Sequence, residues 1–217
     1  MGQKRFVDLS VTIESDLPSD PEMMIPIIDY ITHEMGAEQM KEFFPGVEKE
    51  QLPGGVGWAM EFVSLTTHSG THLDAPYHYH PEMSGGKRAW TIEEIPLEWC
   101  LNDGVLLDFR HKADGDRIDA DDVKKELDRI DYQLKPMDIV LVQTGADKAW
   151  GKAEYLVTGA GMTRESTLYI LDQGVRVVGI DAWSWDRPLP FLAKEFQETG
   201  DPKVIWEAHF AGIEQGY

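Results

Sequence analysis

The stretch His68-Ser-Gly-Thr-His-Leu-Asp-Ala-Pro-Tyr-His78 decides how this sequence is interpreted. It holds three of the seven histidines in the chain, and His80 follows two residues later. The linker Ser-Gly-Thr between the first two histidines is a poor helix former. We therefore expect a strand before His68, a turn at Gly70 and a second extended segment after it.

Side chains two residues apart in an extended segment point to the same side, so His72 and Asp74 should converge. His68 could reach them across the turn. Two imidazoles and one carboxylate suit Zn²⁺, Mn²⁺ or Fe²⁺ and leave positions open for water and substrate. The alternative is a set of hydrogen-bonded structural histidines in a turn, but the number and spacing of the candidate ligands favour a metal site.

His78 lies four residues after Asp74 and follows Pro76, which restricts the local backbone. A histidine held beside a water on a metal is well placed to transfer protons near neutral pH. His78 is thus the candidate catalytic residue. His80 either has a structural role or contacts the residues that hold the metal, and the sequence does not decide between these roles.

Outside this stretch, strands and helices mix without a regular βαβ alternation, which predicts an α/β domain with mixed sheets. The motifs of dinucleotide-binding proteins, phosphate-binding loops and α/β-hydrolases are missing from the sequence. Apolar runs predict strands at 6–13, 58–67, 104–108, 139–144 and 175–180. Periodicity and capping residues predict helices at 33–44, 118–130, 164–173 and 191–199.

Residues 14–57 contain five prolines, Pro18, Pro21, Pro26, Pro45 and Pro53, and we read them mainly as loops. A proline-rich segment of this length ahead of the main body suggests an arm or a lid. A surface loop packed on its own subunit explains the composition equally well.

The 217 residues suit one domain over 1–217, and 42% hydrophobic residues support a substantial core. With 20 basic and 39 acidic residues the net charge is −19, which argues against nucleic acid or an anionic membrane as a partner. One cysteine, Cys100, excludes an intrachain disulfide and fits a reducing compartment. No signal peptide or membrane-spanning run is found, so we expect a cytoplasmic protein.

The segment HSGTHLDAPYH resembles the H-x-G-T-H-x-D-x-P-x-H signature of the cyclase family of metal-dependent hydrolases, which includes bacterial kynurenine formamidase and isatin hydrolase. The resemblance extends over Phe6–Ser10, Asp138–Val142, Gly174–Gly179 and Ile180–Asp186. The segments WSWD and WEAHFAG look more like the isatin hydrolase branch. The family fold implied is a swivelling β/β/α domain with mixed sheets, assembled as a homodimer or tetramer.

The resemblance also implies roles for individual residues. His68, His72 and Asp74 match the metal ligands, with Zn or Mn as the expected ion, and His78 matches the histidine that assists proton transfer. His209 matches a late histidine that approaches the site or holds a second metal in two-metal members. In some members an N-terminal segment closes the site of another subunit, a role that would suit Trp58, Phe43 and Phe44 here.

The predicted function is hydrolysis of a small amide, cyclic amide or formamide, with an aromatic small molecule as the substrate. Tyr77, Trp183 and Trp185 could line the site for such a substrate, although each one singly is better explained as an ordinary core aromatic. The alternative function is a non-catalytic metal- or ligand-binding relative that keeps the fold.

The C-terminal region raises a further expectation. Family relatives continue past the segment matching Trp206–Tyr217 and supply a glutamate to a second metal, and here Glu207 and Glu214 do not occupy the matching place. We therefore expect at most one tightly held metal per subunit, with His209 left beside the site. A missing strand would also leave a sheet edge that a second chain could cover.

Overall fold

The computed structural model describes residues 7–217, and the chain divides into two compact units, Met1–His72 and Leu73–Tyr217. The expected single domain with an arm or lid over 14–57 stays a prediction. Within the described residues there is no helix with both the length and the apolar character that a membrane span requires.

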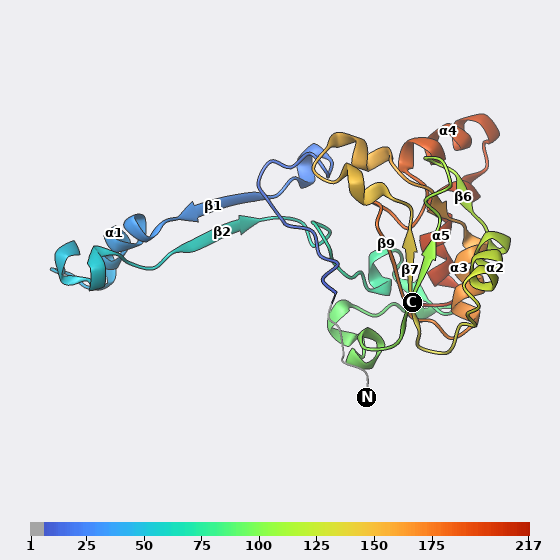
Figure 1. Ribbon diagram of the computed structural model, residues 1–217, viewed down its shortest axis with the longest axis horizontal. Coiled ribbons are helices and arrows are strands. Elements are labelled where there is room, and N and C mark those ends of the chain that lie inside the picture. The colour runs from blue at the N-terminus through green and yellow to red at the C-terminus, as the bar shows by residue number, and fades with distance from the viewer. Residues whose placement is uncertain (1–6) are drawn as a thin grey trace. The chain divides into compact units, whose positions relative to one another are not determined.

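The first unit is built on a two-stranded antiparallel ribbon, β1 (Ile27–Ile31) and β2 (Met60–Ser64), with helix α1 (His33–Phe43) between the strands in sequence (Figure 1). The predicted helix at 33–44 and strand at 58–67 are confirmed with shorter bounds. The strand at Ile27–Ile31 lies where we expected loops. The unit also has three single 3₁₀ turns, Glu22–Met24, Lys49–Gln51 and Pro53–Gly55.

Helix α1 packs closely on the chain that returns from it. A Cβ atom added to Gly36 would lie 1.9 Å from the carbonyl oxygen of Trp58, so only glycine fits there. The Trp58 indole N–H donates to the side chain of Gln39 at 2.8 Å, and its ring contacts Phe43 edge to face. Trp58 and Phe43 therefore contact each other within this unit, while Phe44 is 56% exposed.

The strand expected at 6–13 is wrong for the described part of that range. Residues 7–14 have no regular secondary structure, and Phe6 lies outside the described residues. Side chains take up backbone N–H groups that a neighbouring strand would otherwise bind. Asp8 accepts from the N–H of Ser10 at 2.9 Å, and Thr71 accepts from the N–H of Val11 at 3.0 Å.

The second unit is built on a three-stranded parallel sheet in the order β5 (Gly104–Asp108), β7 (Ile139–Gln143), β9 (Val177–Ile180). Helices α2 (Ala120–Arg129) and α3 (Arg164–Asp172) fall between these strands along the chain. A short strand, β6 (Arg117–Ile118), lies between β5 and α2, so strands and helices do not alternate strictly, as expected. β6 takes the first residue of the predicted helix 118–130, and Asp119 caps α2.

The remaining elements surround this sheet and complete a mixed α/β fold, as predicted. The helices are α4 (Leu189–Thr199) and α5 (Glu207–Phe210), and the short strands are β3 (Glu82–Met83), β4 (Lys87–Arg88) and β8 (Gly161–Met162). The 3₁₀ turns are Pro76–His78, Ile92–Glu94, Leu97–Cys100, Ala146–Ala149, Ala153–Val157, Pro202–Val204 and Ala211–Ile213. β3 pairs with β4 antiparallel, and β6 pairs with β8 parallel.

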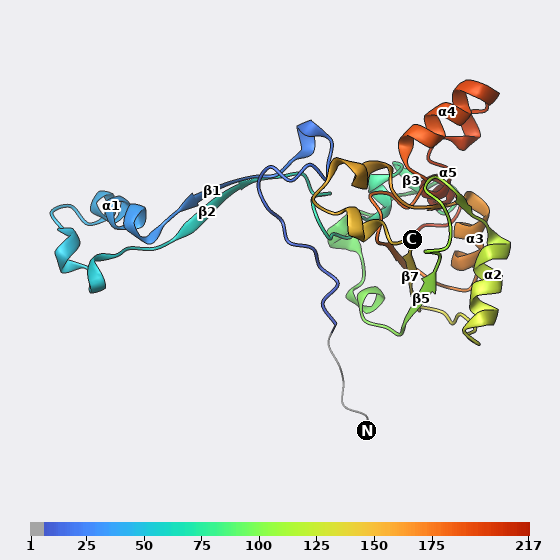
Figure 2. The same cartoon turned by 45° about the horizontal axis from the view of Figure 1, so that its top comes forward.

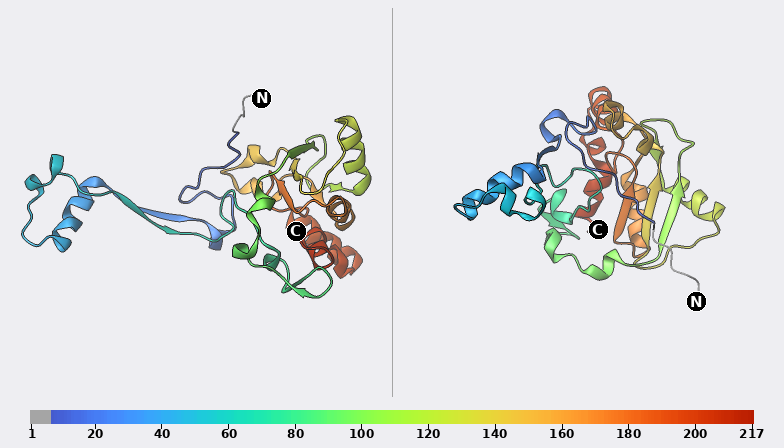
Figure 3. Two further views of the ribbon diagram at one scale, coloured as in Figure 1. Left: turned by 90° about the horizontal axis from the view of Figure 1, so that it is seen from below. Right: turned by 60° about the vertical axis from the view of Figure 1, so that its left-hand side comes forward.

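One face of the parallel sheet forms the core together with α2 and α3, which lie beside it in two views (Figures 2 and 3). Alternate residues of β5 show the two environments of the sheet, because successive side chains point to opposite faces. Leu107 points into the core and is 0% exposed, whereas Leu106 on the other face is 51% exposed.

We predict that Leu107→Ala lowers the free energy of unfolding by about 2–5 kcal/mol, because it removes buried methyl groups and leaves a cavity. Leu106→Ala, one residue earlier on the exposed face, is the matched control and should cost under about 1 kcal/mol. Urea denaturation followed by circular dichroism measures both. Equal losses in the two variants would contradict this assignment of the sheet faces.

Candidate functional site

A tight turn over residues 66–72 orients the first two histidines of the motif. The hydroxyl oxygen of Thr66 accepts from the N–H of His68 at 3.2 Å. Gly70 has φ +66°, and a Cβ atom there would lie 2.9 Å from Ile13, so glycine is required on two counts. The Gly70 turn is confirmed, whereas the preceding strand already ends at Ser64 and the following segment belongs to no strand.

The ring of His72 is held by this turn. Its Nδ1 lies 2.8 Å from the carbonyl oxygen of Gly70. A carbonyl oxygen only accepts, so Nδ1 carries the proton and Nε2 keeps its lone pair. Metal-binding histidines are commonly oriented in this way by a backbone carbonyl. The Nε2 atom lies 3.3 Å from Nδ1 of His68, with the two rings nearly perpendicular.

This separation fits a shared metal ion. Two nitrogen ligands with bonds of about 2.0–2.1 Å to a tetrahedral ion lie about 3.3 Å apart. The ring nitrogens of His68 and His72 therefore have the separation of two ligands of one ion.

A second pair, Asp74 and His78, follows in the other unit. Pro76 begins the 3₁₀ turn Pro76–His78, and the N–H of His78 donates to the carbonyl oxygen of Ala75 at 2.8 Å. His78 Nε2 lies 4.0 Å from Asp74 Oδ2, and the two side chains are 24% and 33% exposed. The backbone restriction expected from Pro76 is thus present, and it holds the imidazole beside the carboxylate.

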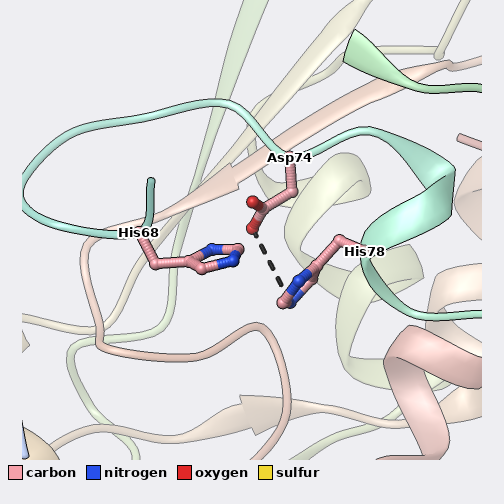
Figure 4. Close-up of side chains that lie close together, drawn as sticks. All are labelled: His68, Asp74 and His78. Atoms are coloured by element: carbon pink, nitrogen blue, oxygen red, sulfur yellow. Dashed lines mark ion pairs between the residues drawn. The ribbon is translucent and has the colours of Figure 1, made fainter. Parts of the chain in front are cut away.

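Figure 4 shows His68, Asp74 and His78 close together, and one ligand atom of each lies within 4.8 Å of the others. His72 is not in this group of three, although its Nε2 atom contacts His68. The motif therefore offers four candidate ligands. One of them, His78, was assigned by sequence reasoning to proton transfer alone.

His209 lies in α5 and is held by a buried carboxylate, that of Asp186. Its Nδ1 is 2.5 Å from Asp186 Oδ2, and its backbone N–H donates to the same oxygen at 3.0 Å. The His209 side chain is 12% exposed and that of Asp186 is 0% exposed. Sequence reasoning gave Asp186 no role; the one available signal was an acidic residue beside two tryptophans in an otherwise apolar segment.

Trp206 joins His78 and His209 into one cluster of rings. The Trp206 ring stacks on His209 with centroids 4.4 Å apart, and it meets His78 edge to face at 5.2 Å. The His78 and His209 centroids are 5.8 Å apart. The His209 ring therefore lies near the proposed proton-transfer residue, and its role at the site stays a prediction.

The three candidate substrate-contacting aromatics have different environments. Trp185 is 6% exposed and donates its indole N–H to Thr167 at 3.0 Å, so it lies in the core. Tyr77 is 58% exposed and Trp183 is partly buried. Only Tyr77 and Trp183 thus retain surface that a substrate could contact.

Nearby acids are committed to other contacts. Glu207 accepts from the N–H of Arg164 at 3.3 Å, and burial raises the pKa of its carboxyl group. Glu214 pairs with the Arg164 side chain. Asp181 accepts from the backbone N–H groups of Thr144 and Gly145, both at 2.7 Å, and so joins the ends of β7 and β9.

Comparison with known proteins places this chain in a family. The family model described as "Putative cyclase" matches residues 7–187, most of the chain. The chain belongs to the cyclase family. A search of the curated proteins finds no match.

Solved structures show the same cyclase fold. An isatin hydrolase bound to the product analogue thioisatinate is 16% identical with a TM-score of 0.69, over 96% of this chain and 75% of that one. Isatin hydrolase A from Labrenzia aggregata, bound to benzyl benzoate, is 21% identical with a TM-score of 0.63, over 85% and 70%. A potential metal-dependent hydrolase with cyclase activity is 21% identical with a TM-score of 0.56, over 94% and 77%. The predicted family and fold class are confirmed.

In this cyclase-family chain two stacked tyrosines connect the segments that carry His78 and His209. Tyr79 follows His78, and its ring stacks on Tyr217 with centroids 5.3 Å apart. The Tyr217 hydroxyl donates to the carbonyl oxygen of Ala208 at 3.2 Å, and the Tyr79 hydroxyl donates to that of Tyr217 at 3.1 Å. Burial raises the pKa of Tyr79 to about 12.

We predict that Tyr79→Phe destabilises the protein by about 1 kcal/mol at pH 8, through loss of these hydrogen bonds. An unfolded tyrosine loses its proton near pH 10 and folded Tyr79 only near 12, so rising pH favours unfolding of the wild type in this window. The difference between wild type and variant should therefore shrink to nearly zero by about pH 11.

Urea denaturation at both pH values measures this difference. Tyr30→Phe is the control, because Tyr30 is 60% exposed and should behave alike at the two pH values. A Tyr79→Phe penalty that is unchanged at the higher pH would contradict the prediction.

Proposed function

We propose that this protein is a metal-dependent hydrolase that cleaves a small amide, cyclic amide or formamide. The observation that carries the proposal is the 3.3 Å spacing of the His68 and His72 ring nitrogens, with the Asp74–His78 pair following in the same motif. Membership of the cyclase family and the isatin hydrolase fold support it.

His68, His72 and Asp74 would hold a divalent ion, Zn or Mn. When bound, such an ion acidifies a water molecule and polarises the carbonyl oxygen of the substrate. Two neutral imidazoles and one carboxylate leave a divalent ion with a net positive charge, which suits it to that chemistry. The turn at Gly70 fixes the His72 ring before any ion binds, so little rearrangement is needed.

His78 would move the proton. An imidazole exchanges protons near neutral pH, and the Asp74 carboxylate 4.0 Å away would stabilise its protonated form. His78 takes the proton from the attacking water and then delivers it to the leaving nitrogen as the C–N bond breaks. The turn that begins at Pro76 keeps the ring in place during both steps.

We propose an aromatic substrate, consistent with the aromatic thioisatinate and benzyl benzoate in the related structures. Of the three candidate aromatics, Tyr77 and Trp183 retain surface that could contact it. The net charge of −19 disfavours nucleic acids and anionic membrane surfaces as partners.

We further propose a homodimer or tetramer in the cytoplasm. The ribbon β1–β2 has two strands among the described residues, and it exposes Ile27, Tyr30, Phe62 and Val63 by more than half. A two-stranded ribbon is marginally stable in water by itself, so a second chain covering it would stabilise it.

The first test of the function is hydrolysis of isatin, N-formylkynurenine and a simple lactone before and after removal of metal by a chelator. We expect turnover of at least one amide substrate, its loss with chelator, and recovery with added Zn²⁺ or Mn²⁺ but not Mg²⁺, because histidine ligands suit the former ions. Metal bound without turnover of any probe would instead support the non-catalytic binding relative.

Variants should separate ligands from the proton-transfer residue. His72→Ala and Asp74→Ala should lose the bound metal in elemental analysis, whereas His78→Ala should keep it and lose about 10²–10⁴-fold in kcat. His80→Ala is the control, because its Nδ1 bonds the backbone of Glu82 and it lies outside the cluster in Figure 4. Metal loss in His78→Ala would show that His78 is a metal ligand and that another residue transfers the proton.

A further inference from the structure

The buried carboxylate of Asp186 is fully occupied by groups of α5. Its Oδ1 accepts from the N–H of Ala208 at 2.8 Å, and its Oδ2 accepts from the N–H and the Nδ1 of His209. The side chain is 0% exposed, so water does not compete for these bonds. A carboxylate that accepts from an imidazole fixes the proton of that ring on the bonded nitrogen.

The neutral His209 ring is thereby set in one tautomer. Nδ1 carries the proton, and Nε2, on the opposite edge of the ring, is a bare acceptor. Within residues 7–217 no hydrogen bond to Nε2 is found. The side chain is only 12% exposed, and an acceptor that loses its hydrogen bond in such a setting costs free energy. The arrangement therefore favours a ligand that brings a donor.

The position of His209 places this acceptor beside the reaction. Its ring stacks on Trp206 at 4.4 Å, and the His78 ring is 5.8 Å away. Trp206 has φ +55°, an unfavourable backbone conformation for a bulky residue, and such strain persists where the surrounding structure enforces it. The strained Trp206 backbone and the Asp186 carboxylate together leave the His209 ring little freedom to turn.

We propose that His209 Nε2 accepts a hydrogen bond from the N–H of the substrate amide, and that Asp186 is the positioning residue that sets it to do so. The proposal rests on the proposed hydrolase function and narrows its substrates to amides that bear an N–H: secondary amides, formamides and cyclic amides. N-Alkylated amides and lactones leave the Nε2 acceptor unsatisfied and are disfavoured.

Kinetics test the selectivity with two matched pairs of probes, formanilide with N-methylformanilide and isatin with N-methylisatin. The wild type should prefer the N–H member in kcat/KM by about 10- to 100-fold, the value of a hydrogen bond to a largely buried acceptor that substrate binding would shield from water. Asp186→Asn replaces one of the two acceptor oxygens with an NH2 group, so the side chain can no longer accept from all three α5 donors and the His209 ring is no longer held in one tautomer. The preference should then fall to nearly 1, as in His209→Leu.

Asp138→Asn is the matched control, because Asp138 is a buried carboxylate at the amino end of β7 that bonds Lys135 and Tyr132. It should keep the wild-type preference. All variants should retain wild-type metal content. Loss of a metal equivalent in Asp186→Asn or His209→Leu would make His209 a ligand and overturn the proposal, as would an unchanged N–H preference in those variants.

¹⁵N NMR of the histidine rings tests the tautomer without turnover or metal. In the metal-free wild type above pH 8, the His209 signals, assigned by their loss in His209→Leu, should show a protonated Nδ1 and a bare Nε2. Formanilide should shift the Nε2 signal upfield and N-methylformanilide should not. A protonated Nε2, or equal shifts with both probes, overturns the proposal even if the protein is an active hydrolase. The expected signals in a protein without turnover would refute only the hydrolase function.

Discussion

The hydrogen bonds that α5 donates to the Asp186 carboxylate are the interaction that holds His209 and its helix in place. Asp186 lies in the loop after β9, and its three donors come from α5, more than twenty residues later. A buried carboxylate is costly to desolvate, and more so in a chain with a net charge of −19. The buried charge is tolerated because both carboxylate oxygens accept hydrogen bonds. The same bonds fix the four-residue helix α5 and the ring of His209.

Local features of the sequence predicted most elements of the second unit. The buried strand at Gly104–Asp108 was predicted with its observed bounds, and the cap at Thr163 places the start of α3 as expected. These signals act over three or four residues, which is why one sequence suffices to recognise them. The turn at Gly70 belongs to the same class, because its positive φ needs glycine whatever the rest of the chain does.

Features that depend on distant partners were not predictable. Strand Ile27–Ile31 exists because Met60–Ser64 pairs with it from the far end of α1, and residues 7–13 form no strand because side chains bind their N–H groups. The sequence suggests Trp185 for substrate contact, but its indole N–H donates to Thr167, eighteen residues earlier, and the ring lies in the core. The sequence likewise predicts no role for Asp186, because no residue near it in the chain identifies His209 as its partner.

Residues 68–78 show where residue spacing stops being informative. His68 and His72 are four residues apart, as are Asp74 and His78, yet the backbone between them differs. The Gly70 turn folds the first pair back on itself and brings two ring nitrogens to 3.3 Å, whereas the Pro76 turn holds the second pair at 4.0 Å. The first distance matches the separation of two nitrogen ligands of one ion, and the second is longer than a direct hydrogen bond. The same four-residue spacing thus gives two different separations, and the glycine and the proline make the difference.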